Sequence, residues 1–212
     1  MEKVNIRIEK GKKYAVVGVS GSGKSTMLKI LANLLNDYHG EVVFDEQCRE
    51  KPIYLDQDTT ILDGSILENV LFGQTCTNER LIQISEAIGL NEVVGRQPQN
   101  WGTEIAKGKN LSRGQEQRIC LARCLIKEAD TYLLDEATSN IDVVDEDKIM
   151  KALIGNQGIL EEKTVLISTH KLSMIDYVDE VIYIKNGRVY QGTHMQLSLI
   201  HISEPTRRTP IS

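Results

Sequence analysis

Residues 18–26 decide the fold, and they read Gly18-Val19-Ser20-Gly21-Ser22-Gly23-Lys24-Ser25-Thr26. The stretch fits the pattern G-x-x-x-x-G-K-[ST], with a further glycine at Gly21. An apolar run at 14–17 precedes it as a buried strand, and residues 27–35 follow it with the apolar spacing of a helix. This order of strand, loop and helix is the context that the pattern requires in a phosphate-binding P-loop.

The residue types of this loop suit a nucleoside triphosphate. Glycines let the backbone bend so that successive N–H groups approach phosphate oxygens, and the following helix adds its positive end. Lys24 can reach the β- and γ-phosphates, and the Ser25 hydroxyl can ligate the Mg²⁺ that bridges them. The alternative, a glycine-rich turn that binds nothing, has no use for Lys-Ser-Thr at a helix start. The expected nucleotide-binding residues are Gly18, Ser20, Gly21, Ser22, Gly23, Lys24, Ser25 and Thr26.

The composition narrows the class of protein. The 212 residues suffice for one sizeable domain, and 41% hydrophobic with 5% aromatic residues suits an α/β protein packed with aliphatic side chains. The net charge of −5 argues against a general basic surface, so no nucleic-acid partner is expected. No apolar run approaches the roughly 18–20 residues that cross a bilayer, and the first residues lack the apolar core of a signal peptide. We expect a cytosolic location, with any membrane role supplied by a partner or by a part of the gene outside this chain.

Two acids follow directly after a buried strand. Residues 131–134 read TYLL and lead to Asp135 and Glu136. Paired acids at the carboxyl end of an apolar strand can supply one carboxylate that positions Mg²⁺ and a second that acts on a water molecule. The long separation from Lys24 is compatible with neighbouring strands around an inserted subdomain. The alternative is that both acids only cap the next turn.

Two further strands end in polar residues. Residues 52–55 lead to Gln57, and residues 164–167 lead to His170. Open α/β sheets bind ligands at the carboxyl ends of their strands, which makes both side chains candidates for one site. Taken alone, Gln57 fits a solvated turn and His170 fits a structural histidine.

The remaining stretches indicate helices, strands and one hairpin. Ser112 and Gln115 form a capping box in front of an apolar helical face, although Gly114 in the first turn lowers helix stability. Asn186-Gly187 is a strong hairpin signal between two strands. The other expected elements are strands at 1–8 and 41–44, helices at 65–72, 78–88, 143–154 and from 193, and an exposed connection at 95–110.

Cys120 and Cys124 lie one helical turn apart, a spacing that metal ligands can share. Neither has a further Cys or His in a zinc-type spacing. We therefore expect reduced thiols on an ordinary helix.

The order of these motifs resembles the nucleotide-binding domain of ATP-binding cassette (ABC) proteins, from about Val4 to Leu197. The most specific piece is Leu-Ser-Arg-Gly-Gln at 111–115, which is similar to the LSGGQ signature of the family, with LLDEATS behind it at 133–139. The resemblance implies an α/β fold with a P-loop NTPase core, whose mainly parallel sheet has flanking helices and antiparallel strands. It implies an ABC ATPase domain at 1–197, with the core at 1–57 and 126–197 and an inserted helical subdomain at 58–125.

The resemblance also implies a dimer. In the family, two such domains pair head to tail and bind ATP between the P-loop of one and the signature of the other. Ser112, Gly114 and Gln115 would then contact ATP held by the P-loop of a second nucleotide-binding domain, in a homodimer or a heterodimer. Asp142 resembles the acid that communicates across the dimer.

The family's catalytic roles carry over to four residues that follow strands. Glu136 would polarise the attacking water, and His170 would contact the γ-phosphate. Asp135 would hold Mg²⁺ through water, with Ser25 and Gln57 as further Mg²⁺ contacts. Gln57 would also sense a transmembrane partner.

Within the family, residues 60–70 and Thr103-Glu104 resemble exporter-type domains. Such exporters usually carry six membrane helices upstream in the same polypeptide, which implies a transmembrane domain as partner and a place at the cytoplasmic face of the membrane. The function expected is ATP hydrolysis that powers an ABC exporter. The alternatives are a soluble ABC ATPase of translation or DNA repair, a P-loop nucleotide kinase, and a fragment that binds ATP without turnover.

Several features depart from the family pattern. Arg113 replaces the first glycine of the signature, and the segment 44–54 is shorter than usual. The aromatic residue that normally stacks on adenine has no counterpart that we can place before Gly18. Residues 198–212 have no helical period and resemble translated vector sequence, so we expect a non-native tail there.

Overall fold

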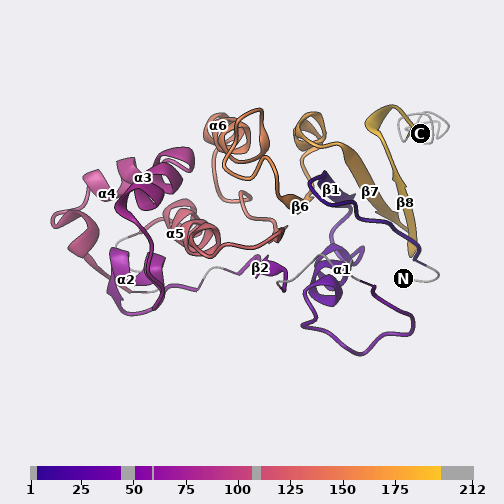
Figure 1. Ribbon diagram of the computed structural model, residues 1–212, viewed down its shortest axis with the longest axis horizontal. Coiled ribbons are helices and arrows are strands. Elements are labelled where there is room, and N and C mark those ends of the chain that lie inside the picture. Colours follow the sequence, from indigo (N-terminus) through magenta and orange to yellow (C-terminus); the bar gives the residue numbers. More distant parts are fainter. Residues whose placement is uncertain (1–3, 44–50, 59, 107–110, 197–212) are drawn as a thin grey trace, which may run out of the picture.

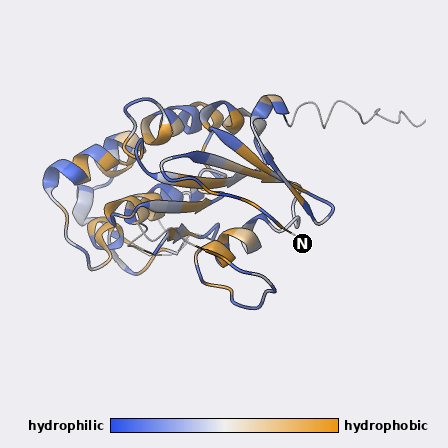
Figure 2. Ribbon diagram, turned by 45° about the vertical axis from the view of Figure 1, so that its right-hand side comes forward, coloured by the Kyte–Doolittle hydropathy of each residue, from blue (hydrophilic) through white to orange (hydrophobic). Residues whose placement is uncertain are grey.

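The computed structural model describes residues 4–43, 51–58, 60–106 and 111–196. Figure 1 and Figure 2 show an α/β fold in which helices cover both faces of a twisted sheet. The strands are β1 (Lys13–Gly18), β2 (Ile53–Leu55), β3 (Gly64–Ser65), β4 (Glu104–Ile105), β5 (Thr131–Asp135), β6 (Thr164–Thr169), β7 (Glu180–Lys185) and β8 (Arg188–Gly192). The α-helices are α1 (Lys24–Leu31), α2 (Ile66–Leu71), α3 (Asn78–Ala87), α4 (Leu90–Gly95), α5 (Arg113–Ile126) and α6 (Val143–Ile154), with 3-10 helices η1 (Asn100–Gly102) and η2 (Leu172–Tyr177).

The main sheet has six strands in the order β2-β5-β6-β1-β7-β8. The first five run parallel, and β8 pairs antiparallel with β7 through a hairpin. Strands β1 and β6 are buried along their whole length, as expected for interior strands of a sheet that is covered on both faces. The mainly parallel sheet with an antiparallel strand, which the family resemblance implies, is therefore confirmed.

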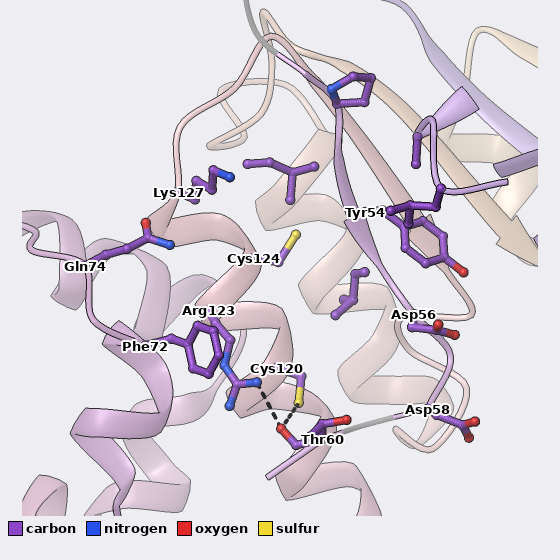
Figure 3. A pocket seen from close by; sticks show the side chains of 15 residues that line it. Tyr54, Asp56, Asp58, Thr60, Phe72, Gln74, Cys120, Arg123, Cys124 and Lys127 are labelled. Carbon is purple, nitrogen blue, oxygen red and sulfur yellow. Dashed lines mark hydrogen bonds between the residues drawn. The ribbon is translucent and has the colours of Figure 1, made fainter. Parts of the chain in front are cut away.

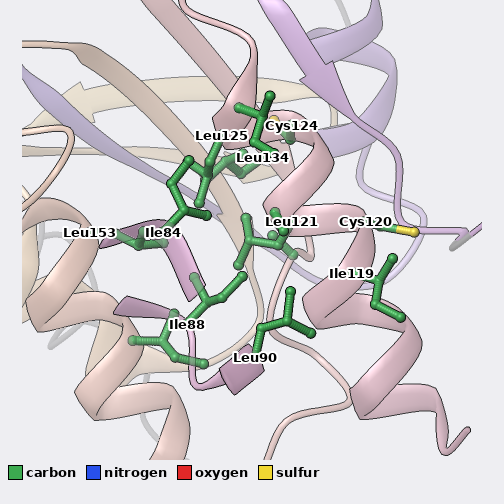
Figure 4. Packing of buried hydrophobic residues seen from close by; sticks show 14 of the residues in the cluster. Ile84, Ile88, Leu90, Ile119, Cys120, Leu121, Cys124, Leu125, Leu134 and Leu153 are labelled. Atoms are coloured by element: carbon green, nitrogen blue, oxygen red, sulfur yellow. The ribbon is translucent and has the colours of Figure 1, made fainter. Parts of the chain in front are cut away.

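Successive side chains of each strand enter different apolar layers. Leu133 and Leu166 pack with Met27 of α1 on one face, whereas Leu134 and Ile167 pack with α5 and α6 on the other. Figure 4 shows this second layer, in which side chains of α3, α5 and β5 meet. The sheet is thus fixed between α1 and the α5–α6 side, which holds the carboxyl ends of its strands in place.

Three helices of this region, α2, α3 and α5, begin at side-chain caps, whereas α4 begins after Gly89 without one. Ser65 and Ser112 each form a complete capping box, with Glu68 and Gln115 respectively, and Thr77 caps α3. The expectation of an exposed connection at 95–110 was wrong over residues 103–105, because Ile105 is buried in β4 and pairs with β3. Residues 107–110 lie outside the described part of the chain.

Other local predictions hold or differ by a few residues. The hairpin is confirmed, since Asn186 and Gly187 both have positive φ, at 50° and 77°. Helix α1 ends at Leu31 and not at 35, because the chain turns at Asn33, whose φ is 57°. Of the strands expected at 1–8 and 41–44, the described residues 4–8 and 41–43 are not in strands. The tail at 198–212 lies outside the described residues.

Within the part of the chain that the structure describes, none of the helices combines the length and the apolar composition needed to cross a bilayer.

Candidate active site

The carboxyl ends of four parallel strands meet at one edge of the sheet. The register pairs Val17 with Thr169 and Asp135 with Ser168, so β1, β6 and β5 end side by side, and β2 ends beside β5. The segments that follow these strands are the loop 18–26, His170, the acids after β5 and Gln57. The structure therefore brings together the candidate residues that the sequence placed after separate strands.

The loop 18–26 is folded tightly over the start of α1. Gly21 and Gly23 have φ of 76° and 105°, a region that favours glycine. A Cβ on Gly18 would lie 2.7 Å from the carbonyl oxygen of Ile184, so the loop packs directly on β7. Lys24 is only 6% exposed, and its Nζ donates to the carbonyls of Gly18 at 2.9 Å and Val19 at 3.4 Å. The lysine is held inside the loop.

The residues of this loop fit a phosphate ligand. The Ser22 hydroxyl is buried and has no hydrogen-bond partner among the residues that the structure describes. Such an orphaned donor is costly unless a ligand or water satisfies it. Together with the Lys24 ammonium and the N-terminus of α1, it gives the loop the donors that a phosphate requires.

Asp135 is fully buried, and hydroxyl groups occupy both of its carboxylate oxygens. Ser168 Oγ donates to Oδ1, and the Tyr54 hydroxyl donates to Oδ2 at 3.0 Å. Burial, followed by the charge of Asp135, raises the pKa of Tyr54, so its hydroxyl keeps its proton. Asp135 is predicted from the sequence as a site residue, but its hydrogen-bond partners Tyr54 and Ser168 are not, because no local pattern marks them. Oxygen ligands of this kind suit Mg²⁺, which proteins hold by one or two carboxylates together with phosphate oxygens.

Glu136 lies between the two other predicted catalytic side chains. Its Oε2 accepts a hydrogen bond from Gln57 Nε2 at 2.8 Å, and its Oε1 lies 3.9 Å from His170 Nδ1. Its backbone has φ of 48°, and its N–H donates to Ser168 Oγ at 3.0 Å. The Glu136 side chain is 17% exposed and that of His170 59%, so the carboxylate is open to a water molecule that it could deprotonate.

The loop after Glu136 is fixed to α5 by Gln117, which sequence reasoning missed. Its Nε2 donates to the carbonyl of Glu136 at 2.8 Å, and its Oε1 accepts from the N–H of Asn140 at 2.9 Å. A Cβ on Gly114 would lie 2.7 Å from the carbonyl oxygen of Asn140. A glycine is therefore needed in the first turn of α5, because the loop after Glu136 approaches it too closely for a side chain.

The signature residues and Asp142 have capping roles in this chain. Ser112 Oγ accepts from the N–H of Gln115 at 3.3 Å, and the Gln115 side chain accepts from the N–H of Ser112 at 2.8 Å. Asp142 Oδ1 accepts from the N–H of Asp145 at 3.0 Å and so caps α6. No hydrogen bond or ion pair joins residues 112–115 to the loop 18–26 in the described structure.

An ion pair between Lys171, the neighbour of His170, and Glu146 of α6 links the segment after β6 to α6. Lys171 Nζ lies 2.6 Å from Glu146 Oε2, and the Thr138 hydroxyl donates to Glu146 Oε1 at 2.6 Å. Sequence reasoning missed this contact as well, because Glu146 and Lys171 are 25 residues apart. The segment that carries His170 is thereby tied to α6.

A pocket of about 510 Å³ lies beside β2, between α1, α2 and α5. Figure 3 shows Arg123 and Cys120 directed at the carbonyl of Thr60 on its wall, at 2.9 Å and 3.7 Å. Burial raises the pKa of the Cys120 thiol and that of Cys124, the latter to about 12, which agrees with ordinary reduced thiols. Within the described residues, no group of three or more His, Cys, Asp or Glu side chains could hold a metal ion.

Comparison with known proteins gives one consistent family. The sequence model described as "ABC transporter" matches residues 1–139. The chain is 36% identical over 206 residues to a mesentericin transport/processing ATP-binding protein of Leuconostoc mesenteroides, covering 92% of this chain and 28% of that protein. It is 31% identical over 209 residues to a putative multidrug export ATP-binding/permease protein of Staphylococcus aureus, covering 93% and 36%. It is 32% identical over 210 residues to the transport/processing ATP-binding protein ComA of Streptococcus pneumoniae, covering 93% and 29%.

The chain spans about a third of the length of these curated relatives, since it covers 28% to 36% of each. The family match covers more than half of the chain and includes the P-loop, the signature and the acids after β5. The chain therefore belongs to the ABC transporter family, as an ATP-binding domain.

Proposed function

We propose that this domain binds MgATP at the loop 18–26 and hydrolyses it with Glu136 as the general base. The observation that carries the proposal is the position of the Glu136 carboxylate, which lies between Gln57 and His170 at the edge of the sheet where the loop also lies. A carboxylate at that edge can take a proton from a water molecule that attacks the γ-phosphate.

The other residues of the site would bind the phosphates and Mg²⁺. Lys24 would leave the carbonyls that it now contacts and reach the β- and γ-phosphates, and the free Ser22 hydroxyl would donate to a phosphate oxygen. Ser25, Gln57 and Asp135 would hold Mg²⁺, which neutralises phosphate charge when it is bound. His170, being exposed, would turn toward the γ-phosphate.

The site is proposed to need a second nucleotide-binding domain. Within the described part of the chain, no hydrogen bond or ion pair joins residues 112–115 to the loop 18–26, and Ser112 is exposed at the start of α5. A partner of the same kind, paired head to tail, would bring its signature to this P-loop, with Asp142 at the junction. In this proposal residues 1–57 and 126–197 are the nucleotide-binding core, and residues 58–125 are the helical subdomain.

The wider function proposed is ATP-driven export across a membrane. The relatives are named as transport/processing or export ATP-binding proteins, one of them as an ATP-binding/permease protein. We infer a transmembrane partner, a place at the cytoplasmic face of the membrane, and the pocket beside β2 as part of the surface that faces this partner. The alternative, a soluble ABC ATPase, would be favoured if the upstream coding sequence held a second cassette and no apolar spans.

Nucleotide binding is tested by equilibrium titration of the purified chain with a fluorescent ATP analogue. The wild-type chain and Lys148→Ala, whose lysine is 71% exposed on α6, should bind with equal affinity. Lys24→Ala should lose binding, because Lys24 is the only Lys or Arg within residues 18–26. Unchanged binding by Lys24→Ala would contradict the assignment of the nucleotide site.

A further inference from the structure

Tyr54 contacts Asp135 across the pair of strands β2 and β5. The register places Tyr54 opposite Leu133, so Asp135 lies two residues further along on the same face of the sheet. A tyrosine is long enough to reach such a diagonal neighbour, and its hydroxyl donates to Asp135 Oδ2 at 3.0 Å. Ser168 donates to the other oxygen.

Tyr54 is itself fixed against the helix that follows the P-loop. Its ring packs with the apolar layer under α1, on the side of β2 away from Cys120 and Cys124 (Figure 3). Lys29 Nζ lies 5.9 Å from the ring centroid and 3.3 Å from Asp56 Oδ2. The hydroxyl therefore projects from a ring that is held by α1 and by its own strand.

The two donors on Asp135 are both neutral. Among the described residues, no Lys or Arg forms an ion pair with this carboxylate. A carboxylate has about four lone-pair sites, of which the hydroxyls of Tyr54 and Ser168 use two. Within the described residues, no hydrogen-bond donor occupies the other two.

We propose that Tyr54 is a positioning residue for Mg²⁺ binding. Its hydroxyl holds the Asp135 carboxylate in one orientation without neutralising it, and the ring links that orientation to α1 and hence to Lys24 and Ser25. The inference rests on the proposed function, because it requires that Asp135 serves a magnesium–nucleotide site. Partners that orient a metal-binding carboxylate typically change metal affinity by about 10- to 100-fold when they are removed.

The test compares the wild-type chain with Tyr54→Phe and with a matched control, Tyr132→Phe. Tyr132 lies in β5, is buried, and donates its hydroxyl to the carbonyl of Lys127 at 2.9 Å, away from Asp135. For each protein, binding of a fluorescent ATP analogue is titrated without divalent ions, and Mg²⁺ is then titrated into the complex. Mn²⁺ binding to the same complex is followed by electron paramagnetic resonance.

Tyr54→Phe should bind the metal-free nucleotide within about twofold of wild type and lose about tenfold or more in Mg²⁺ and Mn²⁺ affinity. Tyr132→Phe should match wild type in both titrations. Unchanged metal affinity in Tyr54→Phe would overturn the inference, as would an equal loss of metal-free nucleotide binding. A wild-type chain that binds no nucleotide would instead overturn the proposed function.

A measurement on the wild-type chain tests the same point without a substitution. The hydroxyl proton of Tyr54 should exchange slowly enough to be seen by nuclear magnetic resonance in the free protein, and it should remain visible in the complex with Mg²⁺ and nucleotide. Exchange at the rate of a solvent-exposed hydroxyl in that complex would show that Tyr54 does not hold Asp135 when the metal is bound.

Discussion

The ion pair of Lys171 and Glu146 gives a sharp prediction, because its two members differ in exposure. The Lys171 side chain is 21% exposed and that of Glu146 is 5% exposed, with 2.6 Å between Nζ and Oε2. Lys171→Met would leave the Glu146 carboxylate buried with the Thr138 hydroxyl as its remaining partner. Glu146→Gln would leave an ammonium that can turn toward water. The first substitution should therefore cost more stability than the second.

The magnitudes follow from what each substitution leaves unpaired. Removing one partner of a buried pair costs about 3–5 kcal/mol, and we expect Lys171→Met near the lower end, at about 3 kcal/mol, because Thr138 still donates to Glu146. Glu146→Gln keeps a polar group in place, so its cost should be that of one weakened hydrogen bond, about 1 kcal/mol. Both values are differences in the free energy of unfolding at neutral pH.

Urea denaturation followed by circular dichroism measures these differences. The control is Lys151→Met, which removes a surface pair of 2.8 Å with Asp147 and should leave the unfolding midpoint unchanged. Equal destabilisation by Glu146→Gln and Lys171→Met, or wild-type stability of both variants, would show that the buried Glu146 carboxylate does not depend on Lys171.

Two further predictions concern the helices beside the site. Gly114→Ala places a methyl carbon 2.7 Å from the carbonyl oxygen of Asn140 and should lower the free energy of unfolding by about 1–3 kcal/mol. The control, Gly95→Ala, places its methyl carbon with no atom within 4 Å and should not destabilise the chain. Equal urea midpoints for the two variants would contradict the close packing at Gly114. Burial acts to raise the pKa of Asp145, but the hydrogen bond and charge of Arg118 outweigh it and hold the pKa below the usual 3.8. This stabilisation is therefore present above about pH 4 and is lost as the pH falls through the folded-state value, so the stability difference between wild type and Asp145→Asn should shrink in acid; a constant difference would exclude the charge effect.

Local sequence signals predicted most of the fold. The buried strands at β1, β5 and β6 and the capping box of α5 depend on residues close together in the chain, and all of them were confirmed. The secondary-structure predictions were wrong where the local sequence signal was weak and tertiary packing determined the conformation. Residues 103–105 look like a polar connection, yet Glu104 and Ile105 pair with β3 and Ile105 is buried.

The contacts that organise the candidate site could not be read from the sequence. Tyr54 reaches Asp135 because of the register between β2 and β5, and Gln117 reaches Glu136 because α5 packs against the following loop. Such contacts depend on how distant elements align, and no residue spacing encodes them. For Gly114 the family resemblance and the structure give different reasons for a glycine. The resemblance implies contact with ATP that a partner domain binds, and the structure shows close packing against the carbonyl oxygen of Asn140 within this chain.

We propose Glu136 as the base for ATP hydrolysis, in a site that a second domain completes. The most direct measurement follows phosphate release and molecular mass together for wild type, Glu136→Gln and the control Glu92→Gln, whose side chain is 73% exposed on α4. In MgATP, Glu136→Gln should bind nucleotide and accumulate as a dimer without releasing phosphate above background, while Glu92→Gln should behave as wild type. Phosphate release by Glu136→Gln at the wild-type rate would show that Glu136 is not the base.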